Sequence, residues 1–208
     1  MRFIFLAAGV GKRIYKKIGK NKCLIEVDNK PLIIKLIQEV ENAGINKISV
    51  VVGFKSLQLK KEIKKFKKVK FIYNKNFRSQ EMLYSLILAL KRYDSDVIIS
   101  YSDILFNKEI IKKVIKNKKN ITIPILKNWK KIWRIRNKNP FIDGETLEID
   151  RKKNLQGIGE KIKILEKTKY QYMGIIFIPK KMRKKFINEY SYLTKNKKLH
   201  VTQFLNLL

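Results

Sequence analysis

The chain has 208 residues, of which 45% are hydrophobic, so it can bury the core of a single domain spanning residues 1–208, and intrinsic disorder is excluded as the default state. No apolar run approaches the roughly 20 residues that a bilayer-spanning helix needs. The formal net charge of +32 raises the question of nucleic-acid binding.

The positive charge is spread over the whole sequence. Only 8 of the 49 basic residues are Arg, and the remaining Lys residues occur in every segment together with many Asn and Ile. Codon usage in an AT-rich genome gives this composition without selection for a partner. We therefore interpret the charge as a solvated Lys-rich surface and do not expect specific nucleic-acid binding. Its field favours anionic small molecules and weak association with RNA or anionic lipid.

The amino-terminal half alternates short apolar runs with amphipathic stretches. The runs, rich in Ile, Val and Phe, predict buried strands at Arg2–Ala7, Lys47–Val52, Val69–Tyr73 and Asp96–Ser100. The stretches between them predict helices at Pro31–Ala43, Ser56–Phe66 and Gln80–Arg92. Pro31 opens the first helix and Gly44 follows it, while Ser56 and Ser79 are candidate N-caps for the others. This alternation predicts an α/β fold, a Rossmann-like, doubly wound and mainly parallel sheet.

The first run, Met1–Gly9, has no small-residue cleavage site after it, so we interpret it as a strand and not as a signal peptide. Cys23 is the single cysteine, which excludes an intrachain disulfide and favours a reducing, cytoplasmic location.

The pattern changes after Asp103. A helix is expected from Asn107, as its cap, to about Lys116. Residues 127–178 then predict a small β lid over the sheet, with an aromatic and basic loop at Lys127–Pro140. The strands expected in and before it are Ile121–Leu126, Thr146–Asp150, Lys161–Glu166 and Tyr172–Ile178, and the helices after it are Pro179–Tyr190 and His200–Leu208.

A glycine-containing loop follows the first predicted strand directly. Its sequence is Leu6-Ala7-Ala8-Gly9-Val10-Gly11-Lys12-Arg13. Small residues let the backbone approach a ligand, and successive N–H groups form a concavity for phosphate oxygens. Lys12 and Arg13 can pair with the β- and γ-phosphates. The loop is neither a Walker A motif nor a dinucleotide fingerprint, and an ordinary tight turn is the alternative.

Asp103 follows the apolar run that ends at Ser100, which places it at the carboxyl end of a central strand, where sheets of this class bind ligands. A carboxylate there suits Mg²⁺, which takes one or two carboxylates together with substrate phosphates. A helix cap is the alternative, although Asn107 is better placed for that.

Aromatic and Arg side chains in the predicted lid are candidates for an acceptor pocket. Trp129, Trp133 and Tyr172 can form an aromatic wall around a cationic group, with core packing as the alternative, particularly for Trp129. Arg134 and Arg136 indicate a phosphate or carboxylate on the acceptor. The only histidine, His200, is expected at the surface or in packing. No catalytic triad and no His/Cys metal cluster can be assembled from the sequence.

Several motifs in order resemble those of a known superfamily. The loop 6–13, Lys22-x-Leu24 and Lys30-Pro31-Leu32 resemble the opening of sugar-phosphate and related nucleotidyltransferases, the MobA-like NTP transferases. The later motifs resemble those of CTP:phosphocholine cytidylyltransferases. They are Asn74 with Phe77-Arg78, Met82–Leu86 with Ala89, Ser102-Asp103-Ile104, Trp133-x-x-Arg136, Asp143-Gly-Glu145, Gly157-Ile-Gly159 and Tyr172–Ile175.

This resemblance implies transfer of a nucleoside monophosphate from an NTP, with CTP expected, to a small phosphorylated or phosphonate acceptor, with release of pyrophosphate. It implies that Lys22 contacts the triphosphate, that Asp103 binds Mg²⁺, and that Glu81, Tyr84 and Ser85 hold the base and ribose. The acceptor is expected near Trp133, Arg136 and Tyr172.

The second metal-binding carboxylate is open. In the resembled families it often follows a stretch like Thr202–Leu205, close to where this sequence ends, so either the sequence is shortened or another acid serves. Glu145 is the candidate, with Asp143 behind it, although both can equally be turn residues. Two other functions stay open: a sugar-1-phosphate nucleotidyltransferase that uses UTP, GTP or dTTP, and an inactive basic protein of the same fold that binds RNA or a membrane surface.

Overall fold

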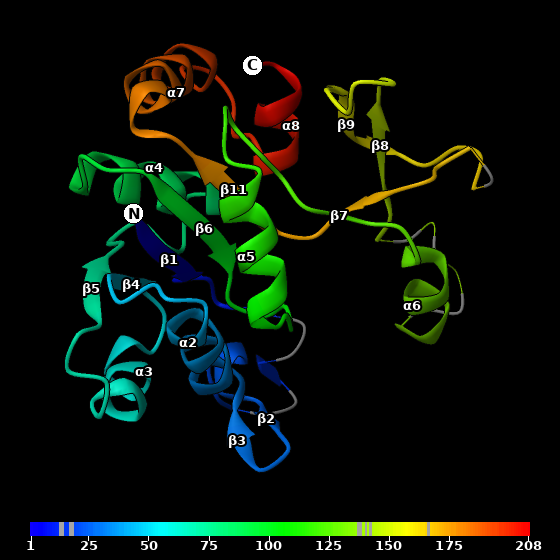
Figure 1. Ribbon diagram of the computed structural model, residues 1–208. Helices are drawn as coiled ribbons and strands as arrows, with labels where there is room; N and C mark the ends of the chain where they lie inside the picture. Colours follow the sequence, from blue (N-terminus) through cyan, green and yellow to red (C-terminus); the bar gives the residue numbers. More distant parts are fainter. Residues whose placement is uncertain (13–14, 17–18, 137–138, 140, 142, 166) are drawn as a thin grey trace.

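The computed structural model describes residues 1–12, 15–16, 19–136, 139, 141, 143–165 and 167–208. Its central sheet has five strands in the order β11-β6-β1-β4-β5. These strands are β1 (Arg2–Ala7), β4 (Ile48–Val52), β5 (Lys70–Tyr73), β6 (Val97–Tyr101) and β11 (Ile175–Ile178). Parallel ladders join β6 to β1, β1 to β4 and β4 to β5, and β11 pairs with β6 in the antiparallel direction. The predicted α/β fold with a mainly parallel sheet is confirmed (Figure 1).

Helices cover both faces of this sheet. Successive residues of β1 point to opposite sides, so that Phe3 and Phe5 join one apolar cluster while Ile4 and Leu6 join the other. The first cluster is completed by α2 (Leu32–Asn42), α3 (Ser56–Ile63) and α5 (Lys108–Lys116), and the second by α4 (Met82–Arg92), α7 (Lys180–Leu193) and α8 (Val201–Asn206). Because both faces are buried there, β1, β4, β6 and β11 are largely apolar runs without alternation, whereas the edge strand β5 is mostly exposed.

The remaining elements are short. They are η1 (Lys22–Leu24), β2 (Glu26–Val27), β3 (Lys30–Pro31), β7 (Ile125–Leu126), α6 (Trp129–Arg136), β8 (Glu145–Ile149), β9 (Leu155–Lys161) and β10 (Gln171–Tyr172). β8 and β9 form an antiparallel pair, as do β7 and β10. Figure 1 shows α6, β8 and β9 beside the helix-covered sheet, at its β11 side. None of the helices in the described residues is both long enough and apolar enough to cross a bilayer.

The lid region differs from its prediction in three places. The expected loop at Lys127–Pro140 contains helix α6, because Trp129, Ile132 and Trp133 have the spacing of one helix face, which the surrounding basic residues obscured. The strand lies at Leu155–Lys161 and not at Lys161–Glu166, so the prediction was wrong there. The strand expected at Tyr172–Ile178 is interrupted before β11 begins.

Glycines explain two of these differences. Gly174 has φ +77, a backbone conformation that separates β10 from β11, and a Cβ there would lie 2.8 Å from Cδ2 of Tyr101. Gly159, with φ +88, lies inside β9, where a Cβ would be 2.9 Å from Cβ of Thr202 in α8. Glycines that the sequence pattern suggested as turn residues therefore permit close packing of the hairpin against the carboxyl-terminal helix.

Helix starts also differ from the expected caps. α3 begins at Ser56, but its cap is Lys55, with φ +48, and α4 begins after Glu81 and not after Ser79. α5 starts after Asn107 as predicted. α7 continues three residues beyond the predicted end at Tyr190.

Candidate functional site

The carboxyl ends of β1 and β6 bring together residues from three separate segments. The Lys22 ammonium donates a hydrogen bond to Oδ2 of Asp103 over 2.6 Å, and the two side chains are 17% and 35% exposed. Gly11 has φ +61, and a Cβ on it would lie 3.2 Å from Cδ of Lys22. The glycine-containing loop, Lys22 and Asp103, 81 residues after Lys22, therefore meet at the edge of the sheet where ligands bind in this class of fold.

Asn21 fixes the position of Lys22. Its side chain is 1% exposed, and its Nδ2 donates to the carbonyl oxygens of Ala7 (3.5 Å) and Phe54 (3.1 Å). Its Oδ1 accepts from the backbone N–H (3.2 Å) and Sγ (3.1 Å) of Cys23. The sequence analysis gave Asn21 no role. The signal was a small polar residue directly before a short apolar turn, which is the pattern of an N-cap.

The predicted phosphate loop is shorter than expected. Leu6 and Ala7 belong to β1 and are buried. Leu6 pairs with both β4 and β6, and Ala7 pairs with β4. Ala8 is also buried, and its carbonyl oxygen accepts from the backbone N–H of Phe54 over 3.0 Å. Gly9 and Lys12 are exposed, so the accessible part of the loop runs from Gly9 to Lys12. Arg13 lies outside the described residues.

Asp103 is held at the end of β6 by its neighbour. The hydroxyl of Ser102, which is fully buried, donates to the carbonyl oxygen of Leu6 over 2.8 Å and locks the end of β6 to β1. The described residues include no group of three or more His, Cys, Asp or Glu side chains that can enclose a metal. One accessible carboxylate suits Mg²⁺, which arrives with nucleotide phosphates and keeps several waters.

Glu145 lies near the same tyrosine as Asp103. The rings of Tyr101 and Tyr172 meet edge to face with centroids 5.9 Å apart. Burial raises the pKa of both hydroxyls, and the negative charge of Glu145 raises each pKa further. Asp103 adds a smaller effect on the pKa of Tyr101. Both carboxylates therefore lie close enough to Tyr101 to act on its hydroxyl, and the raised pKa values hold the two tyrosines neutral.

Gln171 anchors Glu145 through the backbone. Its Oε1 accepts from the backbone N–H of Glu145 over 3.3 Å, and its Nε2 donates to the carbonyl oxygen of the same residue. Gln171 is 3% exposed, so these bonds are made in a dry environment. This pairing of a side chain with a strand start was not expected from the sequence, and it joins β10 to β8.

The two tryptophans of α6 have different surroundings. Trp129 is fully buried, and its Nε1 donates to the carbonyl oxygen of Thr168 over 3.1 Å. For Trp129 the structure therefore agrees with the alternative of core packing. Trp133 is partly buried and meets Trp129 edge to face, with centroids 5.8 Å apart. Arg134 is exposed, and the side chain of Arg136 lies outside what the structure describes.

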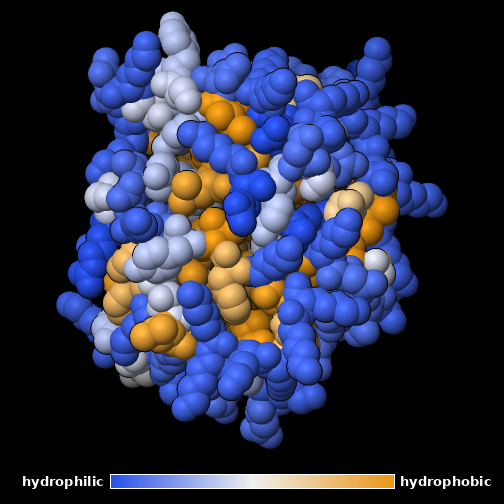
Figure 2. Space-filling view, turned by 90° about the vertical axis from the view of Figure 1, so that its left-hand side faces the viewer, coloured by the Kyte–Doolittle hydropathy of each residue, from blue (hydrophilic) through white to orange (hydrophobic). Residues whose placement is uncertain are grey.

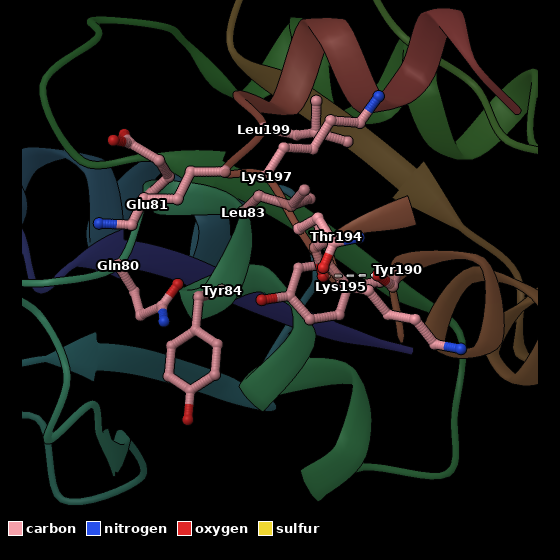
Figure 3. Close-up of a pocket in the computed structure, with 11 residues that line it drawn as sticks. Gln80, Glu81, Leu83, Tyr84, Tyr190, Thr194, Lys195, Lys197 and Leu199 are labelled. Atoms are coloured by element: carbon pink, nitrogen blue, oxygen red, sulfur yellow. Dashed lines mark hydrogen bonds between the residues drawn. The ribbon is translucent and has the colours of Figure 1, made fainter. Parts of the chain in front are cut away.

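A separate cavity of about 430 Å³ lies between the start of α4 and the segment that joins α7 to α8. Glu81 and Tyr84 line it, and its lining includes neither Lys22 nor Asp103. In Figure 3 the Tyr84 ring extends away from Thr194 and Leu199, and its hydroxyl accepts from Nδ2 of Asn76 over 3.2 Å.

The predicted ribose and base residues are thus divided. Glu81, which lines the cavity, also contacts His200, with Oε2 and Nδ1 3.3 Å apart. Ser85 faces the interior, is 4% exposed and accepts from Nδ2 of Asn74 over 2.9 Å. Ser85 therefore ties α4 to the end of β5, and its hydroxyl is not presented to a ligand.

Comparison with known proteins gives matches over most of the chain. Residues 3–133 match the family model of the MobA-like NTP transferase domain. The CTP:phosphoglutamine cytidylyltransferase of Campylobacter jejuni is 32% identical over 182 residues, which are 84% of this chain and 72% of that protein. The choline-phosphate cytidylyltransferase of Streptococcus pneumoniae is 32% identical over 51% of this chain and 46% of its own length.

The fold of the whole chain is also found among solved structures. The inositol-1-phosphate CTP transferase from T. maritima superposes with a TM-score of 0.79 at 17% identity, over 99% of this chain and 80% of that one. Together with the meeting of Gly11, Lys22 and Asp103 at one edge of the sheet, these matches identify the chain as a nucleotidyltransferase that belongs to the family of MobA-like NTP transferase domains.

Proposed function

We propose that the protein is a cytidylyltransferase that transfers CMP from CTP to a small phosphorylated acceptor. The observation that carries this proposal is the Lys22–Asp103 pair beside Gly11, which joins a cation, a carboxylate and a glycine loop at the ligand edge of the sheet. The choice of CTP is supported by the two cytidylyltransferases that are each 32% identical to this chain.

The reaction is an in-line displacement at the α-phosphorus of CTP. An oxygen of the acceptor phosphate attacks and forms the new P–O bond, and the bond between the α-phosphorus and the oxygen that bridges it to the β-phosphate breaks. Pyrophosphate leaves with that electron pair. An acceptor phosphate is already an anion at neutral pH, so the chain needs no general base. Catalysis then consists of alignment and neutralisation of charge.

Lys22 and the loop Gly9–Lys12 hold the triphosphate in this proposal. The aliphatic stem of Lys22 lies beside Gly11, and its ammonium carries the charge that offsets the anion developing around the α-phosphorus. Asp103, with Glu145 as the second candidate, would hold Mg²⁺, which when bound neutralises phosphate oxygens and orients them. Lys22 and Asp103 hydrogen-bond to each other here, so substrate binding has to exchange that contact for contacts to phosphate and metal.

The base and the acceptor are assigned to opposite sides of this centre. Glu81 and Tyr84 offer polar atoms for the nucleoside at the start of α4. The acceptor is assigned to the lid, near Trp133, Tyr172 and Arg136, where burial and the charge of Glu145 keep Tyr172 neutral. A phosphorylated amide such as phosphoglutamine is the acceptor that the Campylobacter relative supports.

The test is pyrophosphate release in Mg²⁺ from CTP, UTP, GTP or dTTP, each combined with phosphoglutamine, phosphocholine, 2-aminoethylphosphonate or glucose 1-phosphate. We expect release with CTP and one of the first three acceptors. Turnover of glucose 1-phosphate with another NTP would replace the proposal by a sugar-1-phosphate nucleotidyltransferase. Silence with every pair, in a folded protein that binds RNA tightly at physiological salt, would favour a non-catalytic protein. A cytoplasmic location is part of the proposal, because Cys23 is a free thiol and NTPs are cytoplasmic substrates.

A further inference from the structure

One face of the molecule combines dense positive charge with exposed apolar side chains. Between Lys60 and Lys70 the sequence has seven Lys and one Glu in eleven residues. Lys clusters occur elsewhere in this chain, so positive charge alone does not identify a binding surface. Here the cluster surrounds Leu57, which is 81% exposed, and Phe71, which is 37% exposed. We name this surface the α3–β5 face, defined by Leu57, Lys60, Lys61, Ile63, Lys64, Phe66, Lys67, Val69 and Phe71.

The α3–β5 face is a shallow hollow of about 530 Å³ with an apolar floor and a rim of lysines. Figure 2 shows the side of the molecule that carries β5, where hydrophobic side chains are gathered between hydrophilic ones. The ammonium group of Lys60 lies 5.6 Å from the Phe71 ring centroid and that of Lys65 lies 5.7 Å from the Phe66 ring centroid. Cations and rings are thus presented together on one surface.

Its place in the fold leaves this face open. β5 is the last strand of the sheet, and among the described residues no further strand pairs with its outer edge. α3 begins directly after β4, at the ligand edge, where Oε1 of Gln58 accepts from the backbone N–H of Asn21 over 3.4 Å. The lysines lie toward and beyond the other end of α3. Leu57, next to Gln58, is the member of the α3–β5 face that lies at this start of α3, and the lysines of the face lie away from the Lys22–Asp103 pair.

We infer that the α3–β5 face binds the surface of an anionic lipid bilayer. The rim lysines match anionic headgroups, which attract polybasic segments at membrane surfaces. Leu57 and Phe71 match the acyl region just below the headgroups, as on interfacial amphipathic helices. A nucleic acid would satisfy the lysines and could stack a base on Phe71, but it would leave the aliphatic Leu57, which is the more exposed of the two, without a partner. A second copy of the chain would bring two lysine-rich edges together, which like-charge repulsion opposes.

The test is co-sedimentation of the full chain with vesicles of phosphatidylcholine alone or with about a third phosphatidylglycerol, at physiological salt. We expect binding to the anionic vesicles only. The variant with Lys61, Lys64 and Lys67 all changed to Gln should bind about a hundredfold more weakly. Its matched control changes Lys113, Lys116 and Lys118 to Gln, removes the same charge from α5 and the turn after it, and should change binding less than about threefold.

A second pair of variants tests the apolar part. Leu57→Gln should weaken binding to anionic vesicles several-fold, whereas Ile135→Gln, at an equally exposed position in α6, should not. Equal losses in the two lysine variants would overturn the inference and leave only the general field of a +32 protein. Unchanged binding by Leu57→Gln, or a dimer in light scattering that Leu57→Gln dissolves, would overturn it as well. Pyrophosphate release without vesicles should be the same in all four variants, which separates this inference from the proposed transferase activity.

Discussion

The two sides of the candidate site are built differently. The side that we propose holds the triphosphate rests on β1 and β6, which are paired in the middle of the sheet. The side that we propose holds the acceptor rests on β7 and β10, two residues each, and on the β8–β9 hairpin. Single side chains hold it in place: Gln171 binds the backbone of Glu145, and Oδ1 of Asn206 accepts from the backbone N–H of Ile158 over 2.9 Å.

From this difference we expect the central strands to determine the rate of the reaction and the lid elements to determine which acceptor is used. Atoms that must be aligned to a fraction of an ångström are carried by strands that cannot shift without breaking the sheet. Contacts that distinguish one acceptor from another are carried by short elements that tolerate change in sequence. Damage on the triphosphate side should therefore lower kcat, and damage on the lid side should raise the acceptor KM.

The largest effect is expected at Asp103. Asp103→Asn should lower kcat/KM by about 10²–10³-fold, because the neutral amide holds a divalent cation and the Lys22 ammonium more weakly than the carboxylate does. The free energy of unfolding should change by less than about 1 kcal/mol, since the ion pair is partly exposed. Steady-state pyrophosphate release and urea unfolding measure the two quantities.

Asp94→Asn is the matched control, because Asp94 also forms an ion pair with a Lys, Lys180 at 2.8 Å, but on an exposed surface at the start of α7. It should retain full activity. Wild-type turnover by Asp103→Asn would remove this carboxylate from the reaction and leave Glu145 as the candidate.

Asn21→Ala is expected to affect both stability and turnover. The change leaves the carbonyl oxygens of Ala7 and Phe54 without their buried donor, which costs about 2–3 kcal/mol. Because Asn21 orients the turn that carries Lys22, kcat should also fall by about tenfold or more. Ser49→Ala removes a different fully buried polar group, a hydroxyl bonded to Tyr93 and Arg2, and should lower stability with little effect on kcat. Equal kcat losses in the two variants would mean that Asn21 acts only through stability.

The same division governs what the sequence could predict. β1, β4, β5 and β6 were predicted to within one residue at each end. The buried strands β1, β4 and β6 are largely apolar runs, and the exposed edge strand β5 is a short run rich in aromatic and β-branched residues. The position of Asp103 at a strand end followed from one of these runs. Where the backbone has no such run, prediction failed: α6 was taken for a loop and β9 for a turn, because basic residues and glycines hide their periods.

Residues that act through tertiary contacts gave weaker signals. Asn21 and Gln171 are buried amides, and their distant partners Ala7, Phe54 and Glu145 lie 14 to 33 residues away, so no local pattern connects them. Ser85 was predicted at the ligand from its motif, yet its bond to Asn74 turns it inward. Motifs identified the region of the site, whereas packing decides which side chain of a motif faces the ligand.

Gln171→Leu tests the lid side. It should remove both bonds to the backbone of Glu145 and loosen β8, at a cost of about 1–2 kcal/mol in stability. The acceptor KM should rise up to about tenfold while the KM for CTP stays constant, because β1 and β6 are untouched. Initial rates with each substrate varied in turn separate the two constants. A rise confined to the KM for CTP would contradict the assignment of the acceptor to the lid.

The smallest expected effect on stability occurs only at alkaline pH. It compares the two sides of the site through one buried ionisable side chain on each side. Burial raises the pKa of the Cys23 thiol, under the triphosphate side, to about 12, although the adjacent Lys22 charge lowers it somewhat. A raised pKa means that the stability from the neutral thiol is complete below the ordinary thiol pKa and is lost as pH rises toward 12. Between about pH 8 and about pH 10.5, wild type should therefore lose about 1–2 kcal/mol more unfolding free energy than Cys23→Ala.

Tyr172→Phe supplies the matching measurement for the lid side. Burial and the charge of Glu145 raise the pKa of Tyr172 above that of an ordinary tyrosine, which itself titrates above a thiol. Its removal should consequently flatten the stability curve only at a higher pH than Cys23→Ala does. If the order were reversed, the hydroxyl of Tyr172 would be reached by solvent before the turn beneath Lys22 opens. The lid would then open at a lower pH than the turn beneath Lys22. Alkaline unfolding would be a second criterion, besides strand pairing, by which the triphosphate side is the more rigid of the two.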